Sequence, residues 1–145
     1  MSKNRKIVIL LDNFARSEAE AALNEFTRAG EDSSRVIVAP VTEIVAGQNT
    51  EEALRAVETG KWPGGSPHKG SKRAALISGA DKSEAIALMR SFKSILPGDA
   101  DPAFALVTGR GMKWTVKEYL SHIREEHEYM KTANPERDAD MKEID

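Results

Sequence analysis

The chain has 145 residues, of which 40% are hydrophobic and 30% are charged, and its formal net charge is −2. This length is typical of one domain with its own hydrophobic core, and the near-neutral charge favours neither nucleic acid nor an anionic membrane as a partner. Because cysteine is absent, disulfides, thiolate nucleophiles and sulfur-ligated metal sites are excluded.

Apolar residues nowhere form a run long enough for a membrane helix, which needs about 18 of them. The apolar run at residues 7–11 follows a basic segment, as in a secretion signal, but it stops at Asp12 and is too short for one. We therefore expect a cytoplasmic protein without a membrane segment.

The first part of the chain predicts a strand, a helix, a second strand and a second helix. Residues 7–11 have the length and composition of a buried strand. An amphipathic helix follows, with apolar residues at the spacing i, i+3, i+4 and i+7: Ala19, Ala22, Leu23 and Phe26. Residues 35–41 are rich in β-branched side chains and contain Pro40, which indicates a strand end or an edge strand. Asn49 followed by Glu52 predicts the capped start of a short helix.

The second part of the chain predicts the same order of elements. Residues 74–77 predict a strand, and residues 81–84 have the pattern of a capping box at the start of a helix. Residues 103–107 predict the fourth strand, and residues 115–118 predict the capped start of the last helix. Residues 132–145 are polar and acidic, so we expect a flexible tail there.

The two parts align with each other at a shift of 66 positions, which places Ser17 on Ser83. The same shift matches other residues: Leu10 with Leu76, Phe26 with Phe92, Val41 with Val107 and Leu54 with Leu120. We interpret this as two copies of one unit, at residues 6–59 and 73–131, joined by a linker at residues 60–72 that is rich in Gly, Pro and basic residues. Chance similarity is the alternative, because the identity between the two parts is low.

Strands that alternate with helices, without a hairpin signal between them, indicate parallel βαβ crossovers. We therefore expect one α/β domain over residues 1–131. Its predicted architecture is a two-layer sandwich of two tandem β-α-β-α units, with a mainly parallel four-stranded sheet and an internal pseudo-twofold. The strand order stays open, because ferredoxin-like and doubly wound arrangements both fit these elements.

The stretch from Gly65 to Lys72 has the composition of a phosphate-binding loop but the wrong context for one. Such a loop follows a strand and leads into a helix, so that backbone N–H groups point at the anion. This stretch follows a predicted helix and precedes a strand, and we reject a nucleotide site of this kind. We expect a flexible linker that contains His68; a mobile basic arm that binds anions is the alternative, because residues 60–73 contain no acid.

In open parallel α/β sheets, ligands bind beyond the carboxyl ends of the strands. The loop after the fourth strand combines glycines, positive charge, an aromatic ring and a helix start, which favours a carboxylate or phosphate. With the residues that end the first two strands, the candidate binding set is Thr108, Gly109, Arg110, Gly111, Lys113, Trp114, Thr42 and Asp12. Each has a structural alternative: Trp114 is favoured as a packing anchor, and the Asp12–Asn13 turn as a helix cap rather than a phosphoacceptor.

Three residues of the last predicted helix, Glu118, His122 and Glu126, stand four apart and could ligate a metal. A solvated helix face with i,i+4 ion pairs is the favoured interpretation. His127 lies on the apolar stripe of this helix and is expected to pack there. We expect no metal and no cofactor, and no set of nucleophile, base and oxyanion donors can be assembled.

Four segments of the second part resemble a family of small bacterial and archaeal domains of unknown function with a V-T…W-[ST]…E-x-L…E-H pattern: Ala105 to Thr108, Lys113 to Thr115, Glu118 to Leu120 and Glu125 to His127. The resemblance covers residues 73–131, with a fainter likeness at residues 6–59, where Gln48 replaces the tryptophan. It implies a compact α/β unit and no particular reaction or substrate.

These observations favour a non-enzymatic binding or protein-interaction domain over an enzyme. A homodimer or a protein partner would suit the repeated scaffold and the acidic last helix. The alternative is a sensor or enzyme for a small anion, phosphate or carboxylate, that uses the loop after the fourth strand. Nucleic acid is not favoured, because the basic residues are few and are balanced by acidic ones.

Overall fold

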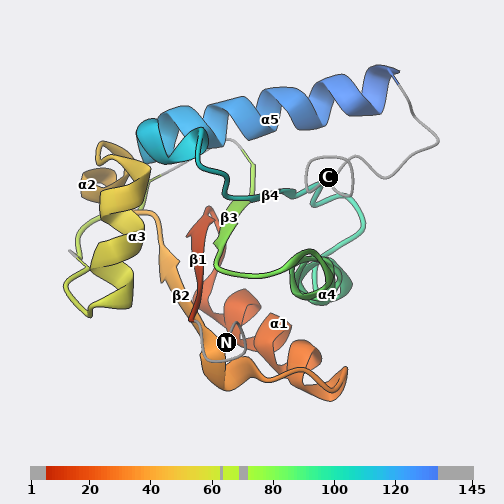
Figure 1. Ribbon diagram of the computed structural model, residues 1–145. Helices are drawn as coiled ribbons and strands as arrows, with labels where there is room; N and C mark the ends of the chain where they lie inside the picture. The colour runs from red at the N-terminus through yellow and green to blue at the C-terminus, as the bar shows by residue number, and fades with distance from the viewer. Residues whose placement is uncertain (1–5, 63, 69–71, 134–145) are drawn as a thin grey trace.

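The computed structural model describes residues 6–62, 64–68 and 72–133. The predicted tail at residues 132–145 lies outside them, apart from the last two residues of the final helix. The centre is a four-stranded sheet with the strand order β2-β1-β3-β4 (Figure 1). Its strands are β1 (Ile7–Asp12), β2 (Val36–Pro40), β3 (Ala74–Ser78) and β4 (Ala103–Leu106). β1 is parallel to β2 and β3 to β4, whereas the central pair β1 and β3 is antiparallel, so the sheet is mainly parallel as predicted.

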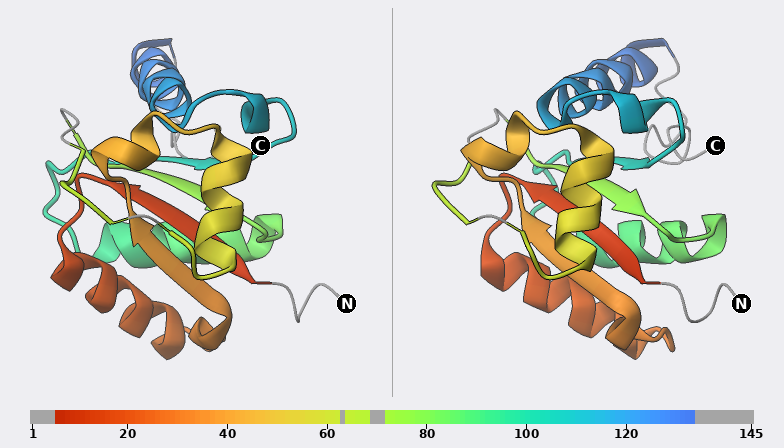
Figure 2. Two further views of the ribbon diagram at one scale, coloured as in Figure 1. Left: turned by 90° about the vertical axis from the view of Figure 1, so that its left-hand side faces the viewer. Right: turned by 60° about the vertical axis from the view of Figure 1, so that its left-hand side comes forward.

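Helices cover both faces of this sheet (Figures 1 and 2). On one face α1 and α4 pack side by side, and on the other lie α2, α3 and α5. The helices are α1 (Arg16–Arg28), α2 (Glu43–Ala46), α3 (Thr50–Glu58), α4 (Lys82–Ser94) and α5 (Val116–Ala133), with two 3₁₀ turns, η2 (Ser33–Arg35) and η3 (Gly111–Lys113). The α/β class is therefore as predicted, but the sheet is the middle of three layers where the sequence analysis expected two.

Successive residues of β1 contribute to two separate hydrophobic cores. Ile7, Ile9 and Leu11 pack with α1 and α4, whereas Val8 and Leu10 pack with α3 and α5. All five are at most 4% exposed. A strand that is buried on both faces has a continuous apolar sequence instead of an alternating one. The same property explains the third layer, because a sheet with two apolar faces is stable in water only when both are covered.

The helix caps agree with the sequence analysis at α4 and differ at α1. At α4, the Glu84 N–H donates to the Asp81 carboxylate over 2.7 Å, and the Asp81 N–H donates to the Glu84 carboxylate over 2.9 Å. At α1 the capping position is Ala15, so the predicted cap at Asp12–Asn13 is wrong. The reason is that β1 continues through Asp12, and Asn13 (φ 67°) then turns the chain before the helix begins.

The predicted flexible linker, residues 60–72, is tied to the fold in its described part. The His68 N–H donates to the Val41 carbonyl over 2.9 Å, and the Glu43 N–H donates to the Ser66 carbonyl over 2.9 Å. Residues 66–68 therefore run along the segment that follows β2. These hydrogen bonds fix His68 at the end of the sheet where β1 and β2 terminate.

Candidate functional site

The carboxyl ends of the four strands lie at two opposite ends of the sheet. Because β1 and β3 are antiparallel, β1 and β2 terminate at one end while β3 and β4 terminate at the other. Asp12 and Thr42 follow the first pair, and the loop from Thr108 to Trp114 follows the second. The structure therefore does not bring the candidate binding residues into one site.

At the second end, the loop from Thr108 to Trp114 is held by the fold through its own polar atoms. The Thr108 N–H donates to the Tyr119 hydroxyl over 3.2 Å. The Trp114 carbonyl accepts hydrogen bonds from the N–H and the hydroxyl of Thr50, at 2.9 and 2.8 Å. The Trp114 ring packs edge-on against the Tyr119 ring, with 5.2 Å between centroids, which fits a packing anchor. The exposed residues of the loop are Thr108, Gly109, Arg110 and Lys113.

At the first end, the buried Asp12 pairs with the half-buried His68. The Asp12 Oδ1 and His68 Nδ1 atoms are 2.9 Å apart, and Asp12 is 3% exposed. Thr42 is also buried, and its hydroxyl oxygen accepts from the Val45 N–H over 3.2 Å, so it caps α2. Of the two sequence candidates at this end, Asp12 is therefore the one that orients another side chain, the His68 ring.

The charge of Asp12 depends on its histidine partner. Burial raises the pKa of Asp12, the hydrogen bond and charge of His68 lower it, and nearby Glu43 raises it; the net shift is upward. A buried carboxylate of this kind is stable in its ionised form when a donor is in contact with it. Because Nδ1 of His68 is engaged with Asp12, Nε2 is the ring nitrogen that can meet a ligand, and it has no hydrogen-bond partner among the described residues.

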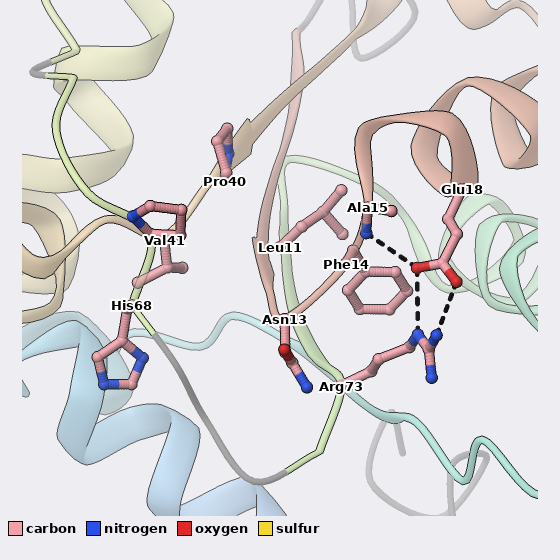
Figure 3. A pocket seen from close by; sticks show the side chains of 10 residues that line it. Leu11, Asn13, Phe14, Ala15, Glu18, Pro40, Val41, His68 and Arg73 are labelled. Carbon is pink, nitrogen blue, oxygen red and sulfur yellow. Dashed lines mark hydrogen bonds and ion pairs between the residues drawn. The ribbon is translucent and has the colours of Figure 1, made fainter.

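Two cavities adjoin this pair, and His68 lines both. One has a volume of about 480 Å³ and is called here the mixed cavity (Figure 3); its lining is Leu11, Asn13, Phe14, Ala15, Glu18, Pro40, Val41, Pro67, His68 and Arg73. The other has a volume of about 360 Å³ and is called the cationic cavity; its lining is Asp12, His68, Lys72, Lys117, Leu120, Ser121, Arg124 and Glu125.

The arginine of the mixed cavity is already neutralised. Arg73 donates two hydrogen bonds to the Glu18 carboxylate, at 2.7 and 3.2 Å, which Figure 3 shows as a fork against the start of α1. The hydrogen bond from Arg73 lowers the pKa of Glu18, so this carboxylate stays ionised at neutral pH. The charges of Arg73 and Glu18 in the lining of the mixed cavity therefore offset each other.

The basic residues of the cationic cavity are less completely paired with carboxylates than Arg73 of the mixed cavity. Arg124 donates to two backbone carbonyls, those of Arg73 and Asp101, at 3.2 and 3.0 Å, and its guanidinium lies 3.9 Å from the Asp101 carboxylate. Lys72 forms ion pairs with Asp101 and Glu128, at 3.4 and 3.6 Å. Lys117 is exposed on the first turn of α5 and forms no ion pair within the described part of the chain. Of the basic groups in this cavity, Lys117 is therefore the one without a carboxylate partner among the described residues, and its ammonium group can donate to an anion.

The three residues considered as metal ligands have other partners. Glu118 accepts from the N–H and hydroxyl of Thr115 at the start of α5, as the predicted capping box requires. His122 and Glu126 form an i,i+4 pair at 3.0 Å. Over residues 6–62, 64–68 and 72–133, no group of three or more His, Asp or Glu side chains is arranged to hold a metal ion.

Sequence reasoning missed His68, Lys117 and Arg124 as site residues. His68 was assigned to a linker because Gly, Pro and Lys surround it, and its partner Asp12 is 56 positions away. The sequence does contain one indication of this pair. Asp12 ends a strand that is otherwise wholly apolar, and a buried carboxylate requires a hydrogen-bond donor from elsewhere in the chain.

The fold and this site define an α/β protein in which a buried aspartate pairs with a half-buried histidine that lines two cavities. Residues 73–130 match the model of a family described as Domain of unknown function (DUF3783). This segment, which runs from β3 into α5, confirms the resemblance seen in the sequence. No curated protein and no solved structure matches the chain. Within the described residues, no helix has both the length and the apolar character needed to cross a membrane.

Proposed function

We propose that the protein is a non-enzymatic binding domain that holds a small anion, a phosphate or carboxylate, in the cationic cavity beside His68. The observation that carries the proposal is a group of cationic side chains in one cavity with this histidine: Lys72, Lys117 and Arg124. The acidic residues of the lining are Asp12 and Glu125, and Asp12 is already bonded to His68. An anion would therefore meet an excess of positive charge and of N–H donors.

The loop from Thr108 to Trp114 is the alternative position for the anion. Its exposed cations are Arg110 and Lys113. Its Thr108 N–H is bonded to Tyr119, so this backbone donor is not free for a ligand. The cationic cavity is favoured because its basic residues come from two segments, before β3 and on α5, that line one cavity together.

Replacing Lys117 by glutamine is expected to weaken the binding of pyrophosphate about tenfold, which corresponds to about 1.4 kcal/mol. The glutamine keeps most of the aliphatic side chain and removes the charge. Isothermal titration calorimetry at low ionic strength would measure the dissociation constant, because a surface charge contact is screened by salt.

Lys113→Gln is the matched control, since it removes the same charge from the loop at the opposite end of the sheet. It is expected to leave pyrophosphate binding unchanged. Weakening by Lys113→Gln without weakening by Lys117→Gln would move the site to the loop. The absence of binding and of thermal stabilisation at millimolar pyrophosphate would contradict an anion site altogether.

We also propose that the chain is an internal repeat with pseudo-twofold symmetry. In the first parallel pair Val8 faces Ile37, and the shift of 66 positions converts this pair into Ala74 and Ala103, which face each other in the second parallel pair. The helices α1 and α4 both have 13 residues and begin at residues 16 and 82, again 66 positions apart.

A reciprocal pair of hydrogen bonds supports the same proposal. The Thr50 N–H donates to the Trp114 carbonyl, and the Val116 N–H donates to the Gln48 carbonyl, each over 2.9 Å. The shift of 66 positions exchanges these two bonds, as a twofold axis between Asn49 and Thr115 would. An experimental structure in which residues 7–59 and 73–125 do not superpose would contradict the repeat.

Self-association is the second candidate function. β2 and β4 are the outer strands of the sheet, and the β2 residues Val36, Ile37 and Val38 are half-buried. An outer strand has backbone N–H and C=O groups on one side that can pair with another chain. Light scattering coupled to size-exclusion chromatography tests this function, and a monomer at every accessible concentration would exclude it.

A further inference from the structure

The mixed cavity continues into a third, apolar cavity of about 400 Å³, called here the apolar groove. The two share the residues Leu11, Phe14, Ala15 and Pro40. The rest of the groove is lined by Arg16, Ala19, Val38 and Ala39. It therefore lies between the start of α1 and the end of β2, and it leads by way of the mixed cavity to His68.

The walls of this groove are apolar and held in place by the core. Leu11, Ala19 and Ala39 are each no more than 6% exposed. Phe14 is fixed by an edge-on contact with Phe92 of α4, with 5.4 Å between ring centroids. A groove with a rigid apolar lining gains free energy when an apolar group displaces water from it.

The number of charged residues in the lining rises from the apolar groove, through the mixed cavity, to the cationic cavity. The groove contains Arg16, whose side chain is 93% exposed and points to solvent, and no acidic residue. In the mixed cavity, Arg73 and Glu18 neutralise each other. Beyond His68, the lining of the cationic cavity includes three basic side chains, those of Lys72, Lys117 and Arg124. A molecule with one apolar end and one anionic end matches this gradient.

We infer that the ligand is an amphipathic anion: a phosphate monoester or carboxylate that carries an alkyl or aromatic group. Its anionic group lies in the cationic cavity beside His68, and its apolar group extends through the mixed cavity into the apolar groove. This inference rests on the proposed anion site and adds the chemical class of the ligand. His68 lines both the mixed and the cationic cavity, and its Nε2 is the ring nitrogen that can contact the anionic group.

Calorimetric titration with inorganic phosphate and with ethyl, butyl and hexyl phosphate tests this inference. Affinity is expected to rise about fourfold for each methylene that enters the groove, because burying one methylene contributes about 0.8 kcal/mol. Hexanol, which has the tail without the anion, is expected to bind far more weakly than hexyl phosphate. Lys117→Gln is expected to weaken every phosphate in the series by a similar factor.

Ala15→Asp places a carboxylate in the lining shared by the mixed cavity and the groove. Aspartate is a favourable residue at a helix N-cap, so this variant is expected to fold. Ala15→Asp should abolish the rise in affinity with the length of the alkyl chain. Ser17→Asp is the matched control, because it adds the same charge two residues further along, at an exposed position outside the cavities. It should leave the gain intact.

The outcomes separate the two proposals. If inorganic phosphate binds and hexyl phosphate binds no more tightly, the amphipathic class is wrong and the anion site stands. A gain with chain length that persists in Ala15→Asp, or hexanol that binds as tightly as hexyl phosphate, also overturns the inference. If none of the phosphates binds, both proposals fail.

Discussion

Gly111→Ala is expected to lower the free energy of unfolding by about 2 to 3 kcal/mol, the upper range for overpacking a core. Gly111 is buried, and a Cβ atom at this position would lie 2.1 Å from Cε2 of Tyr119 and 2.7 Å from its hydroxyl oxygen. Tyr119 is 4% exposed, contacts Trp114 edge-on and accepts from the Thr108 N–H, so its ring has little room to move. Denaturant unfolding measures the loss.

Gly109→Ala in the same loop is the control. No atom lies within 4 Å of the Cβ position at Gly109, so this change is expected to have little effect on stability. A second variant, Tyr119→Leu, shortens the opposing side chain, and Gly111→Ala should cost less in that background. Equal losses for the two glycine variants in the native background would contradict a packing role for Gly111.

The local parts of this fold are predictable from the sequence because their signals are local. The capping residues Asp81 and Glu84 are three positions apart and mark the start of α4 correctly. The strand at residues 7–11 is marked by its apolar run. The antiparallel pairing of β1 with β3 has no such signal, because it joins residues more than 60 positions apart, such as Val8 and Ser78. This pairing decides which loops share an end of the sheet.

The candidate site was predictable in part for the same reason. Asp12 could be chosen as the polar residue that ends a buried strand. Its partner His68 could not be matched to it, because the segment around His68 has the composition of a linker. Glycine, cations and tryptophan in the loop after β4 suggested an anion site. The structure gives Gly111 and Trp114 a role in packing against Tyr119, which the same composition serves equally well.

A second charged cluster, centred on Asp101, connects the loop before β4 to the end of α5. The Asp101 carboxylate lies 2.7 Å from His127 Nε2 and 2.8 Å from Lys131 Nζ. Its own carbonyl accepts from Arg124 over 3.0 Å. Burial raises the pKa of Asp101, but the hydrogen bonds from His127 and Lys131 lower it more, so the net pKa lies well below its ordinary value.

Asp101→Asn is expected to lower the free energy of unfolding by about 2 kcal/mol at pH 7. This is below the 3 to 5 kcal/mol typical of breaking a buried pair, since the Asp101 side chain is 23% exposed and solvent screens part of the interaction. Asparagine tolerates the positive φ of 50° at this position, so the variant removes the charge without adding backbone strain. Chemical denaturation at pH 7 would measure the difference.

The pH dependence of this loss identifies its cause. A carboxyl whose pKa is lower in the folded protein contributes stability that is present above its unfolded pKa, near 3.8, and is lost as the pH falls toward the folded value. The difference between the native chain and Asp101→Asn should therefore be constant near neutral pH and shrink below pH 3.8. Asp99→Asn, at an exposed position two residues earlier, should change little at either pH. A difference for Asp101→Asn that persists unchanged in acid would mean that shape, and not the carboxylate charge, stabilises this junction between the loop and α5.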